Sequence, residues 1–164
     1  MTVEMGQAHL TRYGKFCQVR IMIRDPKGRE CQPLLWPQAV TKLVDKLHIA
    51  ICSVVEGAEL KQGEQVEVYI RPFGIGQGLS RNIVKLPVYY MCPFKASTLA
   101  HEMLHCACKR AKVDLTGYPI GEGIGDDPEH QWIAVTLPMV LRAYRRKHPL
   151  SYFLWFQEYG NVRR

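Results

Sequence analysis

The sequence lacks several features that would place it in a specialised class of protein. It has no apolar run approaching the roughly 18 residues that a membrane-spanning helix needs, so we expect no membrane partner. The N-terminal segment, residues 1 to 16, has no apolar stretch of the kind found in a secretory signal. No internal repeat or low-complexity tract occurs, and hydrophobic residues make up 47% of the chain, so a wholly disordered chain is excluded.

Cysteine pairs of the CxxC type are also missing, although the chain contains six cysteines. Zinc knuckles built from cysteines and thioredoxin-type redox chemistry therefore have little support. Because there is no secretory signal and the chain is long enough to bury a core without disulfides, we expect reduced thiols and a cytoplasmic protein.

The length of 164 residues is that of one domain, and we expect a single domain over 1–164. Its core should lie at about 37–148, after an N-terminal hairpin at about 16–35 and before an aromatic C-terminal segment at 150–164. In this hairpin, a turn signal at 25–28 is expected to join the strand at 16–24 to a second short strand at 29–35. The tail has so many aromatic residues that we expect it to pack on the core.

The formal net charge is +7, and cations gather in the C-terminal region. This concentration indicates either a solvated helix end or weak nucleic-acid binding as an additional property. The basic residues concerned are Arg142, Arg145, Arg146, Lys147, Arg163 and Arg164.

Hydrophobic periodicity predicts an α+β fold. Alternation predicts strands at 16–24, 66–71 and 83–91, and helical spacing predicts an amphipathic helix from 37 to about 56. Pro87 cannot donate a ladder hydrogen bond, which favours an edge position or a bulge for the strand at 83–91. The glycine-rich segment before that strand, residues 74 to 78, is interpreted as a loop at the rim of a cleft.

Two further helices follow. The one from about 93 to 112 is apolar on almost every side, which is typical of a buried central helix. The next begins with Asp126-Asp127-Pro128, a helix cap followed by proline at the first helical position, and extends to about 147 with an expected kink at Pro138.

The central helix carries the HExxH pattern as His101-Glu102-Met103-Leu104-His105. Residues four apart lie on one helical face, so His101 and His105 can bind one metal ion. Glu102 lies about 100° around the helix, where it can act as general base toward a zinc-activated water. Because buried imidazoles and carboxylates are costly unless satisfied, the apolar setting favours a Zn²⁺ site over a chance pattern.

A catalytic zinc ordinarily has three protein ligands. We favour His130 as the third, because it lies in the first turn of the next helix, where it has no evident structural role. Glu129 is the alternative third ligand, although an acidic residue in a first turn also favours the helix itself. Glu122, Asp126 and Asp127 are weaker candidates.

The HExxH helix resembles the active-site helix of zincin zinc metallopeptidases. Within that group, residues 37 to 135 are most similar to compact SprT-like metallopeptidase domains, which place a third histidine beyond a glycine-containing loop, much as 121 to 130 would do. The resemblance implies a minimal zincin-like fold, with a small, mostly antiparallel sheet packed on the HExxH helix and flanking helices. It also implies hydrolysis of peptide or protein substrates, with an extended peptide pairing with the strand at 83–91.

Some assignments stay open at this level. The residue that would stabilise an oxyanion is not identified among the candidates Tyr118, Tyr144, His148 and Tyr159, and Cys108 is expected to pack near the histidines without binding metal. The alternative function is a catalytically inactive zincin-like protein whose structural metal supports binding of a protein or DNA partner. A zinc hydrolase acting on another bond is a third hypothesis.

Overall fold

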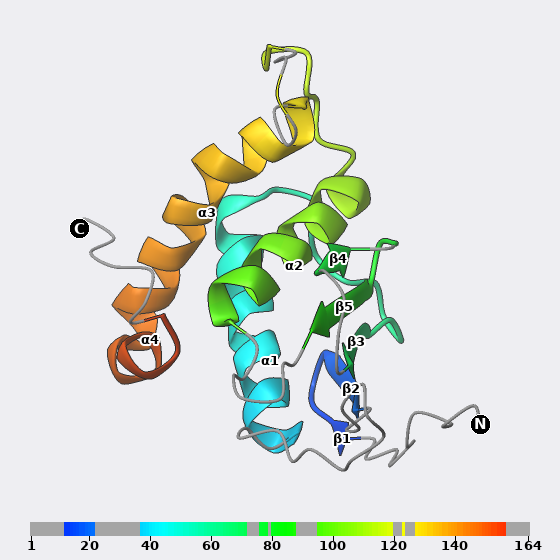
Figure 1. Cartoon of the computed structure of the whole chain (residues 1–164), viewed down its shortest axis with the longest axis vertical. Helices are drawn as coiled ribbons and strands as arrows, with labels where there is room; N and C mark the ends of the chain where they lie inside the picture. The colour runs from blue at the N-terminus through cyan, green and yellow to red at the C-terminus, as the bar shows by residue number, and fades with distance from the viewer. Residues whose placement is uncertain are drawn as a thin grey trace.

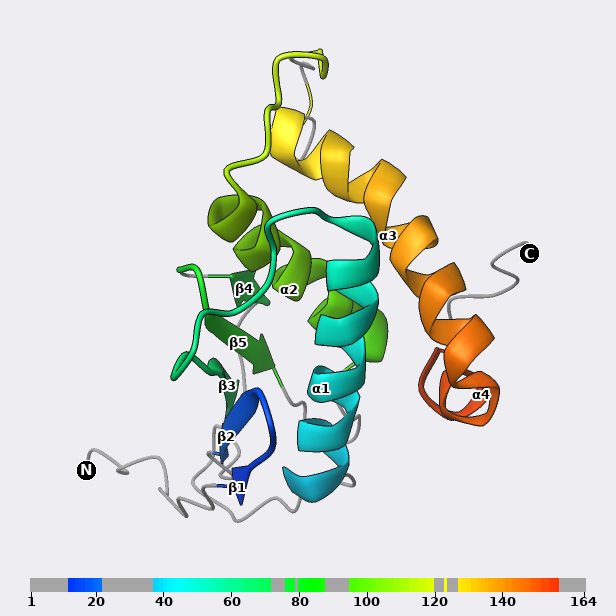
Figure 2. The same cartoon turned by 180° about the vertical axis from the view of Figure 1, so that it is seen from behind.

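The structure, a computed structural model, describes residues 12–21, 37–71, 76–78, 80–87, 95–119, 123 and 127–156. These residues form an α+β arrangement of five strands and four helices (Figures 1 and 2). The strands are β1 (Arg12–Tyr13), β2 (Cys17–Ile21), β3 (Val66–Arg71), β4 (Gln77–Gly78) and β5 (Ile83–Pro87). The helices are α1 (Pro37–Val54), α2 (Ala96–Ala111), α3 (Pro128–Lys147) and α4 (Pro149–Phe156).

The prediction of a mostly antiparallel sheet is wrong. The strand order is β1-β2-β3-β5-β4, and the two longest pairings, β2 with β3 and β3 with β5, are parallel. Only the two-residue strands at the ends of this order, β1 and β4, pair antiparallel. For the β2–β3 pair the reason is that α1 lies between these strands in the chain and provides the long crossover that a parallel pair requires.

Two expectations about individual strands also need correction. The strand in the expected hairpin at 16–35 is β2, but its antiparallel partner β1 precedes it, and the proposed second strand at 29–35 lies outside the described residues. The strand β5 is not at an edge, because it lies between β3 and β4. Its Pro87 ends the described strand and has no β4 residue opposite it, so the missing donor disrupts no β4–β5 pairing.

One face of the sheet is covered by helices. Along β3, Val66, Val68 and Ile70 are buried, and the residues between them are half-exposed, which is the pattern of a sheet with one covered face. Helices α1 and α2 lie against the buried face, and α3 lies on the side of these two helices away from the sheet (Figures 1 and 2). The arrangement therefore places α2 between the sheet and α3.

The helix predictions agree well with the structure. Helix α1 begins at Pro37 as expected, and α3 begins at Pro128 with Asp127 as its N-cap and runs through Pro138. In α4, Tyr152 and Phe156 are buried, but Leu150, Phe153 and Leu154 are 81%, 63% and 77% exposed, so one face of α4 packs on the core. The rest of the aromatic segment, from residue 157, lies outside the described residues.

None of the helices in the described ranges is both long and apolar enough to span a bilayer. The cysteines at positions 17, 52, 106 and 108 are free thiols, and the other two, at 31 and 92, lie outside the described residues.

Candidate metal centre

Helix α2 presents two histidines outside its buried surface. Most of its side chains are buried, in agreement with the sequence prediction, whereas His101 and His105 are half-buried. They lie one turn apart, and the helix ends beyond them at Lys112, which adopts the left-handed conformation with φ 50°. The two imidazoles therefore stand side by side on a rigid element and remain accessible from outside the core.

The third histidine is held by a helix cap. Asp127 Oδ1 accepts a hydrogen bond from the backbone N–H of His130 at 2.8 Å, and Asp127 Oδ2 lies 2.8 Å from His130 Nδ1. A proton on Nδ1 donated to this carboxylate leaves the other ring nitrogen, Nε2, with a free lone pair. Asp127, the N-cap of α3, thus also fixes the orientation of the His130 ring.

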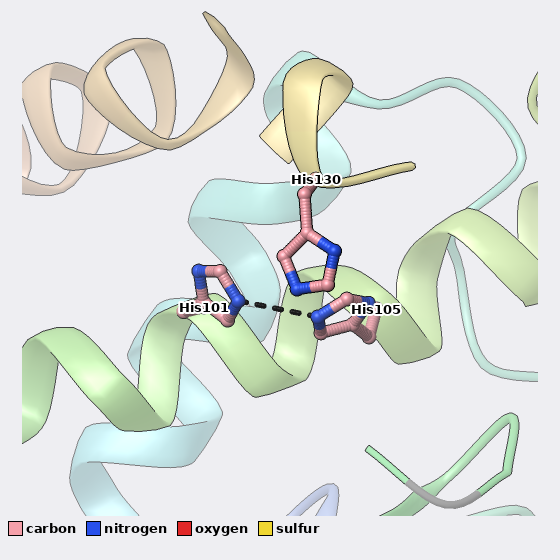
Figure 3. Close-up of side chains that lie close together, drawn as sticks. All are labelled: His101, His105 and His130. Atoms are coloured by element: carbon pink, nitrogen blue, oxygen red, sulfur yellow. Dashed lines mark hydrogen bonds between the residues drawn. The ribbon is translucent and has the colours of Figure 1, made fainter. Parts of the chain in front are cut away.

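The three histidines converge. One ligand atom from each of His101, His105 and His130 lies within 4.8 Å of the others, a group that could hold a metal ion. Figure 3 shows the His130 ring reaching from the start of α3 toward the two rings on α2. The Nε2 atoms of His101 and His105 are 3.2 Å apart. Two nitrogens at the 2.0–2.1 Å usual for zinc would be about 3.3–3.4 Å apart in a tetrahedral site, so this spacing fits the ion.

Two of the three imidazoles have a carboxylate within hydrogen-bond distance of their Nδ1 atom. Glu129 Oε1 lies 2.6 Å from His105 Nδ1, and Asp127 occupies the same position behind His130. Carboxylates placed in this way fix the tautomer and orientation of metal-binding histidines. Glu129, the alternative third ligand, is therefore engaged with His105 in the structure. Two weaker candidates, Glu122 and Asp126, lie outside the described residues.

One histidine of the group, His101, has the protonation state that metal binding requires. Burial, together with the positive charges that His105 and His130 can carry, lowers the pKa of His101 to about 4. The ring of His101 is therefore neutral at neutral pH and offers a lone pair.

Glu102 occupies the side of the helix that faces the sheet. It is only 7% exposed, and burial raises the pKa of its carboxyl group. Charges on His105 and a hydrogen bond from the backbone N–H of Gly78 act in the opposite direction. A buried carboxylate whose pKa is raised is a candidate for exchanging protons.

A cavity of about 520 Å³ lies beside the histidines. Its walls include His105 and His130, the carboxylates behind them, and Lys109. The cluster is therefore open to a space large enough for part of a ligand.

Other candidates from the sequence lie elsewhere. Tyr144 and His148 are 14 and 18 residues beyond His130 on the same helix and its cap, which corresponds to about 20–27 Å along the axis, and Tyr144 bonds to Ser151. Tyr118 packs against the core, and Tyr159 lies outside the described residues. Cys108 is buried in the core, as its expected packing implies.

Three of the C-terminal cations lie far along α3 from this centre, and Arg163 and Arg164 lie outside the described residues. Arg145, Arg146 and Lys147 form the last turn of α3, at the end opposite to His130, where positive charge favours the helix.

Sequence reasoning missed the role of the glycine-rich segment. A Cβ atom on Gly78 would lie 2.8 Å from the backbone oxygen of Glu102 and 2.9 Å from His105 Cβ, so β4 passes directly over the HExxH helix. Lys109 donates a hydrogen bond to the carbonyl oxygen of Gly78 at 3.1 Å. The position of Lys109, four residues after His105, was the one available signal, because it predicts the same helical face.

This close approach leads to a prediction for stability. Gly78→Ala should destabilise the protein by about 1–3 kcal/mol, because the new methyl group meets backbone that cannot move without shifting β4. Gly76→Ala is the matched control, since its Cβ would meet side-chain atoms of Thr98 and Glu102 at 3.0 and 3.1 Å, which can adjust. Urea denaturation of both variants measures the difference, and equal stabilities would contradict the packing of β4 on α2.

No family model, curated protein or solved structure matches the chain. The geometry of the histidine cluster and of Glu102 therefore stands on its own as the basis for a function.

Proposed function

We propose that this protein is a zinc-dependent metallopeptidase of the zincin type, similar to SprT-like domains in its HExxH helix and in a third histidine from the following helix. The observation that carries the proposal is the convergence of His101, His105 and His130, with Glu102 buried next to them. The HExxH motif and the nearness of His130 are independent observations, because His130 lies 25 residues after His105 and outside the motif. Their agreement favours a built metal centre over a chance pattern.

The roles of the residues follow from their positions. His101, His105 and His130 would hold the ion through Nε2, and Glu129 and Asp127 would orient two of these rings. When bound, zinc lowers the pKa of water and polarises the carbonyl group of the substrate. Glu102 takes a proton from the attacking water as its oxygen bonds to the carbonyl carbon, and passes that proton to the amine as the C–N bond breaks.

The substrate in this proposal is a peptide or protein. In the described part of the sheet, β4 is the outermost strand beyond β5, and it packs closely against Glu102 of α2. An extended peptide that adds to this strand would place its main chain along the cluster. The edge strand that the sequence assigned to 83–91 is thus replaced by β4 in the proposal.

The test is the metal dependence of hydrolysis. The purified protein should contain about one equivalent of zinc by mass spectrometry, as a three-histidine site implies. It should cleave fluorescein-labelled casein, lose this activity with a chelator, and regain it when zinc is restored. One equivalent of zinc without hydrolysis would overturn the peptidase and support the non-catalytic binding protein instead. Absence of zinc would overturn both.

A further inference from the structure

Both backbone polar groups of Gly78 are bonded to side chains of helix α2. Its N–H donates a hydrogen bond to the carboxylate of Glu102, and its carbonyl oxygen accepts one from Lys109 Nζ at 3.1 Å. Gly78 is one of the two residues of β4, which pairs with β5 on its other side. The groups that bond to α2 are therefore the ones that β5 does not use.

These two groups are what an added strand would need. In an antiparallel pair, one residue gives its N–H and its C=O to the same residue of the neighbouring strand. An extended peptide that joins β4 at Gly78 must take these positions. In the structure both positions are already occupied, the N–H by Glu102 and the carbonyl oxygen by Lys109.

We propose that Lys109 and Glu102 form a latch that closes the edge of β4 until an extended peptide displaces them. The inference rests on the proposed function and deepens it in two ways. When a peptide binds to β4, it displaces Glu102 from Gly78. Substrate binding and release of the general base therefore occur in the same step. Only a segment that offers a free main chain can compete for Gly78, so the substrate class is unfolded or extended protein segments.

The surroundings of Lys109 keep the free-energy cost of its displacement from Gly78 small. Its side chain is 41% exposed, and its ammonium group lies 3.9 Å from Glu129 Oε1. After leaving Gly78, the ammonium group keeps a carboxylate partner and contact with solvent, so no buried charge is left unpaired. Glu129 in turn holds His105, which connects the latch to the metal centre.

The test compares Lys109→Met with Lys42→Met, an exposed lysine of α1 that serves as the control for loss of one charge. Both changes are made in the zinc-loaded full chain carrying Glu102→Gln, whose amide oxygen still accepts from Gly78. Fluorescence anisotropy with unfolded, fluorescein-labelled casein should show a Kd lower by about three- to tenfold for Lys109→Met, because one competing hydrogen bond is removed. Lys42→Met should have no effect. An unchanged or higher Kd for Lys109→Met overturns the latch.

Amide exchange followed by NMR tests the same latch without any substrate. The Gly78 amide should be protected in the wild type and should exchange faster in Lys109→Met, since β4 loses an attachment to α2. If the Gly78 amide in the wild type exchanges as fast as an amide on an unpaired sheet edge, the inference is overturned. The proposed function fails by a different result, absence of zinc or of casein hydrolysis in the wild type, and the exchange measurement does not depend on either.

Discussion

Replacing Glu102 by glutamine should abolish proteolysis and leave the zinc content unchanged. Glutamine has the shape of glutamate and can still accept a hydrogen bond from Gly78, but it cannot take a proton from water. General acid–base catalysis contributes about 10²–10⁴-fold, so we expect a fall of that size in kcat/KM. Because Glu102 lies beside the three histidines and is not one of their group, the metal should stay bound.

The measurement is hydrolysis of labelled casein, with zinc counted by mass spectrometry in the same samples. Glu56→Gln is the control for loss of a carboxylate, because Glu56 is exposed in the turn after α1. It should keep full activity. A Glu102→Gln variant that hydrolyses casein at the wild-type rate would contradict the assigned general base, and one that loses zinc would show that Glu102 supports the metal centre itself.

The helices could be predicted because their information is local. Apolar residues at helical spacing and the Asp127-Pro128 start define α1 and α3 within single stretches of sequence. The HExxH pair is local as well, since residues four apart on a helix must lie together. His130 could be named as a candidate because a first-turn histidine served no purpose in the helix, but its position next to α2 depends on tertiary packing.

The sheet could not be predicted in the same way, because its pairings join distant segments. A turn signal at 25–28 favoured a hairpin over the crossover that α1 makes between β2 and β3. The strand β4 has only two residues, too few for any alternation to be visible. Its place at the outer end of the sheet follows from β5 inserting between it and β3, which no local pattern encodes.

Residues with two roles were the hardest to assign. An acidic residue in the first turn of a helix is explained by the helix dipole, and a lysine near the end of a helix is explained in the same way. Glu129 and Lys109 satisfy these local rules and in addition bond to His105 and Gly78. Sequence alone therefore gave Glu129 as an alternative ligand and gave no role to Lys109.

Zinc affinity should distinguish His130, a metal ligand, from Glu129, a carboxylate that orients a ligand. His130→Ala should remove one of three ligand nitrogens, and the protein should retain far less than one equivalent of zinc after dialysis. Glu129→Gln should weaken zinc binding by about 10- to 100-fold, because it only loosens the orientation of His105. His148→Ala is the control, since that histidine lies at the other end of α3.

The two variants are expected to differ because the ring nitrogen of His130 lies in the cluster, whereas the Glu129 carboxylate is bonded to the opposite nitrogen of His105. Zinc affinity is measured by competition with a chromogenic chelator, and circular dichroism confirms that each variant is folded. His130 also receives the cap of Asp127 through its backbone N–H, which the alanine variant keeps, so the start of α3 should be intact. Unchanged affinity in His130→Ala together with a complete loss in Glu129→Gln would reverse the assignment and make Glu129 the third ligand.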